Sequence, residues 1–312
     1  MAKLIILCGL PGSGKSQYAE GLMDLAVMYG NEEMVIHSSD AIRGELFGDP
    51  NSQEDNGKVF DLLHTRVKSD LRDGKTVIYD ATNITRKARR IAINLIDPMR
   101  DEVEVHVIWA PVETCIQRDA QRDRTVGPEV IDKMLRRWQS PDAHTEGFDA
   151  IYLVNTDDTF NQVEYVSRQT AQMHIPHDNP HHTLGVYDHC LQTCLNLVNS
   201  GEVISDELRA AAYWHDIGKP YTKFYKKNKE TGEIDYSKAH FYDHQNVGAY
   251  LAYGLFINRP ILTQPQTELA CKVSWLINVH MDPFLNTKFY KELPTAEKHW
   301  IDLLHKADVE TH

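Results

Sequence analysis

The sequence predicts two domains of different class: an α/β domain with a doubly wound parallel sheet, followed by an all-α domain. Up to about residue 155, short apolar runs alternate with helical patterns, which is typical of a parallel sheet covered by helices. From Thr183 onward the apolar spacing is mainly helical. A length of 312 residues suits two domains, which we place at 1–168 and 169–312.

Each expected element follows from its own local pattern. Apolar runs predict strands at Leu4–Cys8, Met34–His37, Thr76–Tyr79, Val103–Trp109 and Ile151–Val154. Helical spacing predicts helices near 15–29, 58–72, 84–97, 112–121 and 128–139. The polar stretch Asn155–Pro180 has room for a helix at 160–171 and is expected to end as a linker. Later helices are expected at 184–199, 206–217, 243–256, 264–280 and 295–308, with a turn between two short strands in 220–240.

Composition and charge exclude several classes of protein. A net charge of −12 argues against a broad nucleic-acid coat, so any nucleic-acid contact is expected to be local. We find neither an apolar run long enough to span a bilayer nor a signal peptide, so no membrane association is expected. Five cysteines without a Cys-x-x-Cys pair favour a reducing cytoplasm. Twelve of the sixteen histidines follow residue 173, which favours metal chemistry in the second domain.

A phosphate-binding loop follows the first predicted strand. The segment Gly9-Leu-Pro-Gly-Ser-Gly-Lys-Ser16 matches G-x-x-x-x-G-K-[ST], in which backbone N–H groups cradle a phosphate at the start of a helix. Lys15 would reach the β- and γ-phosphates, and the Ser16 hydroxyl would bind Mg²⁺. A turn that only joins strand to helix is the alternative, disfavoured by the complete match. We therefore expect ATP to contact Gly9, Leu10, Pro11, Gly12, Ser13, Gly14, Lys15, Ser16 and Gln17.

Polar residues after the next two strands are candidates for the acceptor site. Asp40 and Arg43 follow the second strand, at the edge where α/β sheets bind ligands. There a carboxylate can take a proton from an attacking hydroxyl, and an arginine can hold an acceptor phosphate. The alternative is an N-cap aspartate beside a solvated arginine. Asp80-Ala-Thr-Asn83 ends the third strand, where acidic or amide groups organise a metal or its water.

Two further groups of basic residues have open roles. Arg118 and Arg122 are four residues apart on a predicted helix face, either a lid that clamps the transferring phosphate or a salt-bridged surface. The basic run Arg86–Arg90 either grips phosphates of a longer acceptor or forms a solvated helix face, which we favour.

Together these motifs resemble the kinase domain of phage-type 5′-hydroxyl polynucleotide kinases, over about residues 1–155. The resemblance implies that Asp40 is the general base for the 5′-hydroxyl and that Arg43 binds the acceptor's phosphate. It also implies that the transferring phosphoryl group, and with it ATP, is contacted by Lys15, Arg118 and Arg122.

The second domain carries an ordered set of histidines and aspartates. The adjacent pair His215-Asp216, followed by Lys219, offers a nitrogen and a carboxylate to one divalent metal. Further candidates lie on or at the ends of separate predicted helices, which a bundle can bring together: His189, His244, His280 and Asp308. For any single histidine, packing is the alternative. His182 is open between substrate contact and surface, His240 is expected at the surface, and Cys190 and Cys194 are expected to pack.

This set resembles the HD phosphohydrolase superfamily over about residues 180–310, in its two-metal form. The resemblance implies one ion held by His189, His215, Asp216 and Asp308. It implies a second ion held by His244, His280 and a bridging Asp216. Lys219 would contact the substrate phosphate, and Mn²⁺, Co²⁺, Ni²⁺, Fe²⁺ and Zn²⁺ all suit such ligands.

One half thus attaches phosphate and the other removes it, which is reasonable only at different positions of one substrate. Bacterial and phage RNA-repair enzymes that fuse an HD phosphatase to a polynucleotide kinase are similar in content, although their HD domain comes first. We therefore expect end healing of RNA, or of DNA: 5′-hydroxyl phosphorylation with removal of 2′,3′-cyclic, 2′- or 3′-phosphate, and a ligase as partner. The alternatives are a nucleoside or metabolite kinase fused to a nucleotide phosphohydrolase, and a nucleotide-sensing module.

Overall fold

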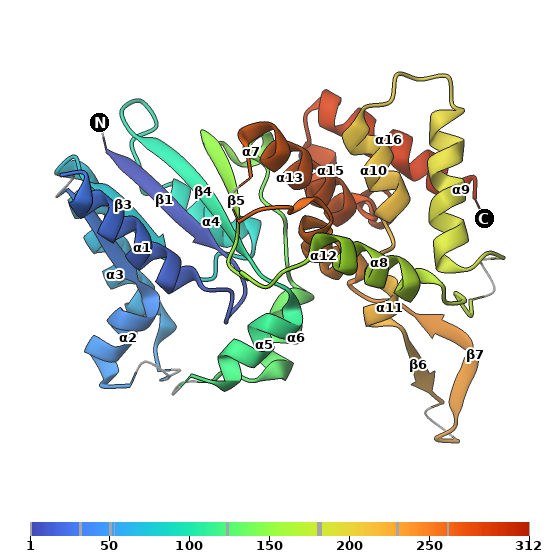
Figure 1. The fold of residues 1–312 in the computed structure, drawn as a ribbon, viewed down its shortest axis with the longest axis horizontal. Helices are drawn as coiled ribbons and strands as arrows, with labels where there is room; N and C mark the ends of the chain where they lie inside the picture. Colours follow the sequence, from blue (N-terminus) through green and yellow to red (C-terminus); the bar gives the residue numbers. More distant parts are fainter. Residues whose placement is uncertain are drawn as a thin grey trace. The chain divides into compact units, whose positions relative to one another are not determined.

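The computed structural model describes residues 2–30, 33–49, 52, 54–122, 125–179, 183–228, 231–260 and 262–311. The chain divides into two units (Figure 1). The first comprises Met1–Met134, Pro141–Asp158 and Arg259–Thr267, and the second comprises Leu135–Ser140, Thr159–Asn258 and Glu268–His312. Among the described residues, we find no helix that is both long enough and apolar enough to cross a bilayer.

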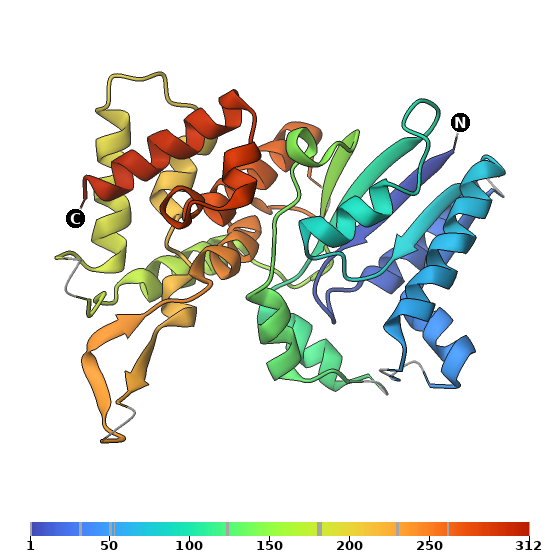
Figure 2. The same cartoon turned by 180° about the vertical axis from the view of Figure 1, so that it is seen from behind.

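The first unit is built on a parallel sheet of five strands, as the sequence predicts, and the structure gives their order as β2-β3-β1-β4-β5. The strands are β1 (Lys3–Cys8), β2 (Met34–Ser38), β3 (Thr76–Asp80), β4 (Glu102–Trp109) and β5 (Ala150–Asn155). The central strands are buried almost throughout, as expected for a sheet flanked by helices (Figure 2). Because β1 lies between β3 and β4, the glycine loop after β1 is at the middle of the carboxyl edge.

The five helices predicted for the N-terminal part of the chain are present, and their observed ends lie within a few residues of the expected ones. They are α1 (Lys15–Met28), α3 (Asn56–Arg72), α4 (Arg86–Ile93), α5 (Val112–Ala120) and α6 (Pro128–Leu135). On one face, Ala19 and Leu22 of α1 pack against Ile5, Leu7 and Ile78 of the sheet. Among the described residues of this part of the chain, two further helices were not predicted, α2 (Ser39–Phe47) and the short α7 (Ala143–Glu146).

A buried ion pair fixes α4, where we expected a solvated basic face. Arg89 is fully buried, and its Nε and Nη2 donate to the two oxygens of Glu146 at 2.8 and 2.7 Å. Its Nη1 also donates to the carbonyl of Asn83 at 3.0 Å. The expectation was wrong at Arg89 because its partner lies 57 residues along the chain, beyond the reach of a local pattern.

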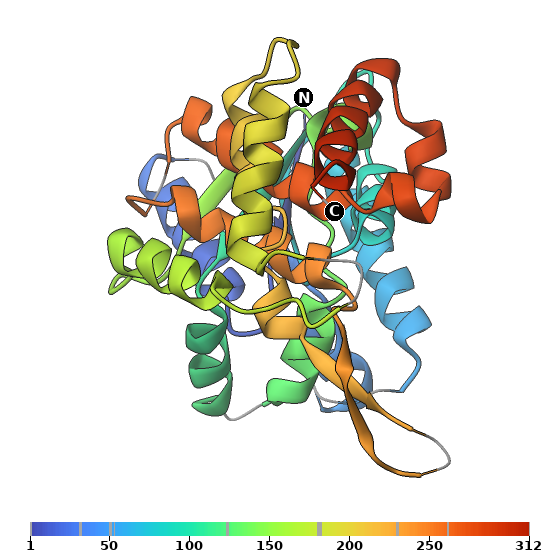
Figure 3. The same cartoon turned by 90° about the vertical axis from the view of Figure 1, so that its right-hand side faces the viewer.

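The second unit is helical. Its longer helices are α8 (Gln162–Met173), α9 (Val186–Val198), α10 (Asp206–Trp214), α12 (His244–Phe256), α13 (Gln264–Val279) and α16 (Thr295–Val309). Shorter ones are α11 (Lys219–Thr222), α14 (Asp282–Leu285) and α15 (Lys288–Glu292). The predicted turn joins β6 (Phe224–Lys227) to β7 (Ile234–His240), an antiparallel hairpin that projects from these helices (Figure 3).

Helix α12 is the core element of this unit, buried on nearly every side. Tyr250 and Tyr253 meet the edge of Trp138, with ring centroids 5.0 and 6.0 Å apart. The helix expected at 160–171 forms as α8 and packs here: the Tyr165 hydroxyl donates to the carbonyl of Leu251 at 2.9 Å.

We expect Glu146→Gln to lower the free energy of unfolding by about 3–5 kcal/mol, because it leaves the Arg89 charge buried without its counter-ion. Glu45→Gln is the matched control, since Glu45 makes the same two-pronged contact with Arg66, at 3.0 and 2.6 Å, on the surface. Its loss should cost about 1 kcal/mol or less. Urea-induced unfolding of both variants measures the difference, and equal effects would contradict the argument.

Candidate active sites

The glycine loop has the steric requirements of a phosphate cradle. Gly12 and Gly14 adopt left-handed backbone conformations, with φ of +78° and +85°. A Cβ at Gly12 would lie 2.1 Å from the carbonyl oxygen of Cys115, so no other residue fits without backbone movement. The buried hydroxyl of Ser13 has no hydrogen-bond partner among the described residues, a polar atom that a phosphate oxygen could satisfy.

Lys15 and Ser16 open helix α1 directly after this loop. The Lys15 ammonium is buried and donates to the carbonyl of Leu10 at 2.8 Å. Burial lowers the pKa of Lys15, while the nearby Asp80 carboxylate opposes that shift. The Ser16 hydroxyl donates to Asp80 Oδ2 at 2.9 Å. A hydroxyl beside a carboxylate is an oxygen donor set that suits Mg²⁺, so the residues fit the expected metal.

Asn83 has a different role from Asp80. We expected both to organise the metal or its water, but the Asn83 side chain donates to the carbonyls of Leu7 and Ala81 at 2.8 and 3.3 Å. It is buried and adopts a left-handed backbone conformation, with φ of +46°. Asn83 therefore fixes the end of β1, from which the glycine loop departs.

Asp40 and Arg43 form a pair in the first turns of α2. Arg43 is buried; it donates to Asp40 Oδ1 at 3.1 Å and to Asn56 Oδ1 at 2.6 Å. The Asp40 side chain remains 55% exposed, so it is open to an acceptor. The N-cap of α2 is Ser38, which overturns the N-cap alternative for Asp40. Ser38 pairs in register with Asp80, so Asp40 follows its strand at the same edge as the Ser16–Asp80 pair.

Arg118 and Arg122 do not share a helix face, contrary to our expectation. Helix α5 ends at Ala120, and Arg122 lies exposed in the following turn. Arg118 donates to the hydroxyl and the carbonyl of Thr156 at 3.0 and 2.7 Å, and the Thr156 hydroxyl donates to the Ser13 carbonyl at 2.8 Å. Arg118 is thus tied to the loop through Thr156. Burial lowers the pKa of Lys15, and the positive charge of Arg122 makes a smaller contribution in the same direction.

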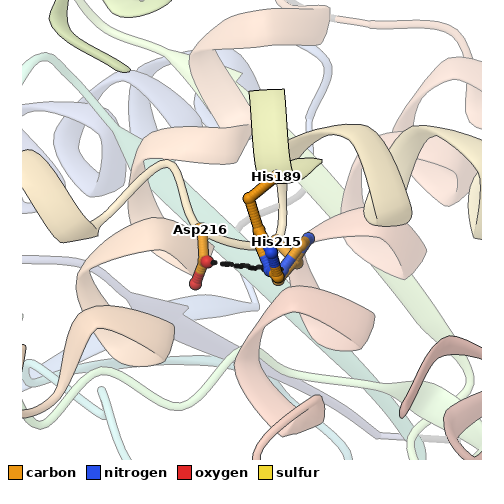
Figure 4. Close-up of side chains that lie close together, drawn as sticks. All are labelled: His189, His215 and Asp216. Atoms are coloured by element: carbon orange, nitrogen blue, oxygen red, sulfur yellow. Dashed lines mark hydrogen bonds and ion pairs between the residues drawn. The ribbon is translucent and has the colours of Figure 1, made fainter. Parts of the chain in front are cut away.

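In the second unit, separate helices bring together the first group of predicted metal ligands (Figure 4). His189 lies in α9, and His215 and Asp216 follow α10. The Nε2 atoms of His189 and His215 are 3.2 Å apart, and Asp216 Oδ2 lies 3.6 and 3.4 Å from them. From α16, Asp308 Oδ1 lies 2.8 Å from His189 Nε2.

The other oxygen of Asp216 faces a second group. Asp216 Oδ1 lies 3.2 Å from His244 Nε2 and 3.9 Å from His280 Nε2. These two nitrogens are 3.2 Å apart. One buried carboxylate therefore stands between two pairs of imidazoles, an arrangement with the ligands for two neighbouring cations.

The same backbone contact orients three of these histidines. The Nδ1 atoms of His215, His244 and His280 lie 2.7–2.8 Å from the carbonyl oxygen of the residue three positions earlier: Ala212, Phe241 and Ile277. An Nδ1–H that donates to a carbonyl directs the Nε2 lone pair toward the centre, as in metal-binding histidines generally.

Local charges favour the ionised carboxylates and a neutral His280. Burial opposes ionisation of Asp216, but Lys219 and His215 outweigh it and hold its pKa well below the usual range. Burial lowers the pKa of His280 to about 3, helped by His244 and His215. For His215 burial works in the same direction, but the groups around it, Asp216 among them, outweigh it and raise its pKa well above 6.5. A bound cation would replace that proton, so the donor set fits divalent metals.

His177 is a member of this centre that the sequence analysis missed, because we expected its segment to be a linker. It is 1% exposed, its Nδ1 lies 2.7 Å from the carbonyl of Leu184, and its Nε2 lies 3.0 Å from Lys219 Nζ. Lys219 Nζ in turn lies 2.6 Å from Asp216 Oδ2. The only signal was a histidine between two prolines, in Ile-Pro-His-Asp-Asn-Pro, which is also typical of a linker.

His240, Cys190 and Cys194 belong to neither group of metal ligands. His240 is half-buried beside Phe224 and Tyr242, with ring centroids 5.4 and 5.5 Å away. Cys190 is buried and Cys194 half-buried, and both are free thiols. His182 lies outside the described residues.

We expect Asp216→Asn to weaken Mn²⁺ binding by more than about 100-fold, because the amide removes the shared negative charge; loss of a supporting group alone costs 10–100-fold. Asp206→Asn, at an exposed position at the start of α10, should leave the affinity unchanged. Isothermal titration calorimetry of both variants measures this, and wild-type affinity in Asp216→Asn would refute the bridging assignment.

Comparisons with known proteins match each half of the chain to a different domain family. Residues 4–141 match the model of the AAA domain family, and residues 181–307 match that of the HD domain family. The chain is 24% identical over 159 residues to the Protein KTI12 homolog of Xenopus laevis, covering 50% of this chain and 57% of that protein. It is 27% identical over 138 residues to the L-seryl-tRNA(Sec) kinase of Methanococcus maripaludis, covering 44% and 53%. It thus spans just over half the length of these relatives.

A solved structure, that of the Pnkp1/Rnl/Hen1 RNA repair complex, is 25% identical, with coverage of 43% of this chain and 42% of that chain and a TM-score of 0.38. The glycine loop, the sheet order, the paired His/Asp groups and the two family matches lead to one conclusion. The chain combines an N-terminal P-loop kinase-like domain, which matches the AAA domain family, with a C-terminal HD domain, and this pair of domains indicates an enzyme. The first domain implies ATP with Mg²⁺, and the second, with its clustered His and Asp side chains, implies divalent metal.

Proposed function

We propose that this chain heals nucleic-acid ends, RNA in preference to DNA. The first unit would transfer the γ-phosphoryl group of ATP to a 5′-hydroxyl, and the second would remove a 2′,3′-cyclic, 2′- or 3′-phosphate. The observation that carries the proposal is the presence of two centres of opposite chemistry in one chain: Lys15 beside the Ser16–Asp80 pair, and Asp216 between two pairs of histidines. Adding and removing phosphate at one position would be futile, so two ends of one substrate are the coherent target.

In the kinase unit, Asp40 is the proposed general base. Arg43 is held by Asn56 and donates to one oxygen of Asp40, which fixes the carboxylate while its side chain remains half-exposed. The proton of an acceptor hydroxyl would pass to that carboxylate as the oxygen attacks phosphorus. Arg43 would also hold the acceptor's phosphate, Lys15 and Arg122 would stabilise the transferring group, and Arg118 would support the loop through Thr156.

In the HD unit, the two groups around Asp216 would hold the ions, with Asp308 completing the first. Such ions polarise a phosphoryl oxygen and activate water. Lys219 is buried beside Asp216 and would neutralise the substrate phosphate.

One observation from the comparisons, independent of the geometry, supports RNA as the acceptor. The relative from Methanococcus maripaludis is named as a kinase of a seryl-tRNA, so its acceptor is attached to RNA. A 5′-phosphate and a free 3′-hydroxyl are the ends that a ligase joins, so a ligase is the expected partner.

A second candidate is a nucleoside or metabolite kinase fused to a nucleotide or cyclic-nucleotide phosphohydrolase. The net charge of −12 favours it, because a polyanionic substrate is repelled by an acidic chain. Salt separates the two candidates: a polynucleotide substrate predicts binding that weakens with salt by a slope set by a few phosphates, and a nucleoside predicts almost none.

The first experiment incubates the chain with ATP, Mg²⁺, Mn²⁺ and a short RNA that carries a 5′-hydroxyl and a 2′,3′-cyclic phosphate. Mass spectrometry should find a phosphate gained at the 5′ end and the cyclic phosphate removed. An RNA unchanged at both ends, together with phosphorylation of a compound from a nucleoside panel, would overturn the proposal in favour of the second candidate.

Two variants should separate the activities. Asp40→Asn should slow 5′ phosphorylation by about 10²–10⁴-fold at saturating ATP, because the general base is lost, and should leave hydrolysis intact. Asp216→Ala should abolish hydrolysis and leave phosphorylation intact. Asp61→Asn, exposed on α3, is the control for the first variant. Undiminished phosphorylation by Asp40→Asn would remove the general-base role.

A further inference from the structure

The β6–β7 hairpin begins at the metal centre. Lys219, the first residue of α11, contacts Asp216, and β6 starts at Phe224, five residues after Lys219. The base of the hairpin is tied to the segment that carries His177. Lys223 Nζ and the Tyr225 hydroxyl donate to Asp178 Oδ2 at 2.8 and 2.6 Å, and the backbone N–H of Ala239 donates to the Asp178 carbonyl at 2.7 Å. The hairpin is therefore anchored to the centre before it projects from the helices (Figure 3).

Two aromatic rings of the hairpin region are largely exposed to solvent. Tyr236 is 67% exposed and Tyr242 54% exposed. Tyr236 meets Tyr225 at a centroid distance of 5.1 Å, and Tyr242 meets Phe224 at 5.3 Å. Exposed rings beside a catalytic centre are the platforms on which unpaired bases stack.

The same hairpin is basic within an acidic chain. From residue 223 to residue 242 the sequence carries five lysines and three acidic residues, whereas the whole chain has a net charge of −12. Lys226, Lys227 and Lys238 are exposed, and Lys226 Nζ donates to the Tyr242 hydroxyl at 2.7 Å, which places a cation at a ring.

A cavity of about 580 Å³ lies at the foot of the hairpin. Tyr236 and Ser237 of β7 line it, as do His174, His177, Tyr187 and Asp188. The rings of His174 and Tyr187 are stacked, with centroids 4.3 Å apart. His177 joins this cavity to the centre, because its Nε2 lies 3.9 Å from Asp216 Oδ2. The volume is in the range that holds a small ligand, such as one nucleotide.

We propose that the hairpin and this cavity form a track for single-stranded nucleic acid that leads its 3′ end to the His177–Lys219 side of the metal centre. The terminal nucleoside would occupy the cavity beside Tyr187, with its phosphate toward Lys219. The preceding nucleotides would stack on Tyr236 and Tyr242 while the lysines neutralise their phosphates. This inference rests on the proposed function and adds to it how the HD unit would select a strand over a mononucleotide.

The test compares phosphate release from a ten-nucleotide uridine RNA with a 3′-phosphate and from uridine 3′-monophosphate. For the wild-type enzyme, the kcat/KM for the RNA divided by the kcat/KM for uridine 3′-monophosphate should be greater than one. The triple variant Lys226→Glu, Lys227→Glu, Tyr236→Ala should lower that ratio about ten-fold or more, since one lost base stack alone has about that effect. Lys288→Glu with Lys291→Glu reverses two exposed charges on α15 and should not change it. Equal values for the two substrates in the wild type would overturn the track.

A second measurement keeps the track and the proposed function apart. The same RNA, with 4-thiouridine next to its 3′ end, is irradiated with the full chain, and the crosslinked peptides are identified. Crosslinks in 223–242 or at the cavity support the track even if neither substrate loses phosphate, an outcome that would overturn only the proposed function. Crosslinks confined to the first unit, or none at all, would overturn the track even if the ends are healed.

Discussion

Burying a carboxylate costs several kcal/mol unless cations or hydrogen-bond donors surround it, and the second unit is arranged around that requirement at Asp216. The two carboxylate oxygens of Asp216 face different pairs of histidines. Lys219 Nζ lies 2.6 Å from one of these oxygens, Oδ2. Each of the helices α9, α10, α12, α13 and α16 has a ligand in its first or last turn or directly after its last residue, so the packing of these helices brings the ligands together. For His215, His244 and His280, the carbonyl oxygen that orients the ring comes from the residue three positions earlier in the chain.

The first unit depends on an equivalent constraint at the middle of its sheet. Close approach of the Cys115 carbonyl leaves room only for glycine at position 12, and Asn83 holds the strand from which the loop departs. Strand order then places Asp80 next to the loop, within reach of Ser16. The buried Arg89–Glu146 pair supports this arrangement, because Arg89 also donates a hydrogen bond to the Asn83 carbonyl. Hydrogen bonds therefore connect the buried Arg89–Glu146 pair, through Asn83, to the strand that leads into the glycine loop.

The two centres differ in how they treat charge. In the kinase unit the glycine loop has two cations tied to it, Lys15 directly and Arg118 through Thr156, which suits a transferring phosphoryl group. The HD unit gathers ionised carboxylates and histidines, which suits metal ions that activate water. Although the chain is acidic overall, residues 223–242, which form the hairpin beside the HD centre, carry five lysines against three acidic residues.

The sequence alone was sufficient for what depends on short-range pattern. Strand and helix periodicity predicted the five strands and most of the helices, and motif spacing identified the glycine loop and the ordered His/Asp set. What it could not supply are contacts between residues far apart in the chain. Arg89 resembles any exposed basic residue until Glu146 is folded against it, and His177 resembles part of a linker until Lys219 lies 3.0 Å away. Likewise, only the folded chain shows that the Asn83 side chain donates a hydrogen bond to the backbone of β1 and that α5 ends before Arg122. Local pattern determines which elements form, whereas the desolvation of charges and polar groups in the packed interior decides which residues meet.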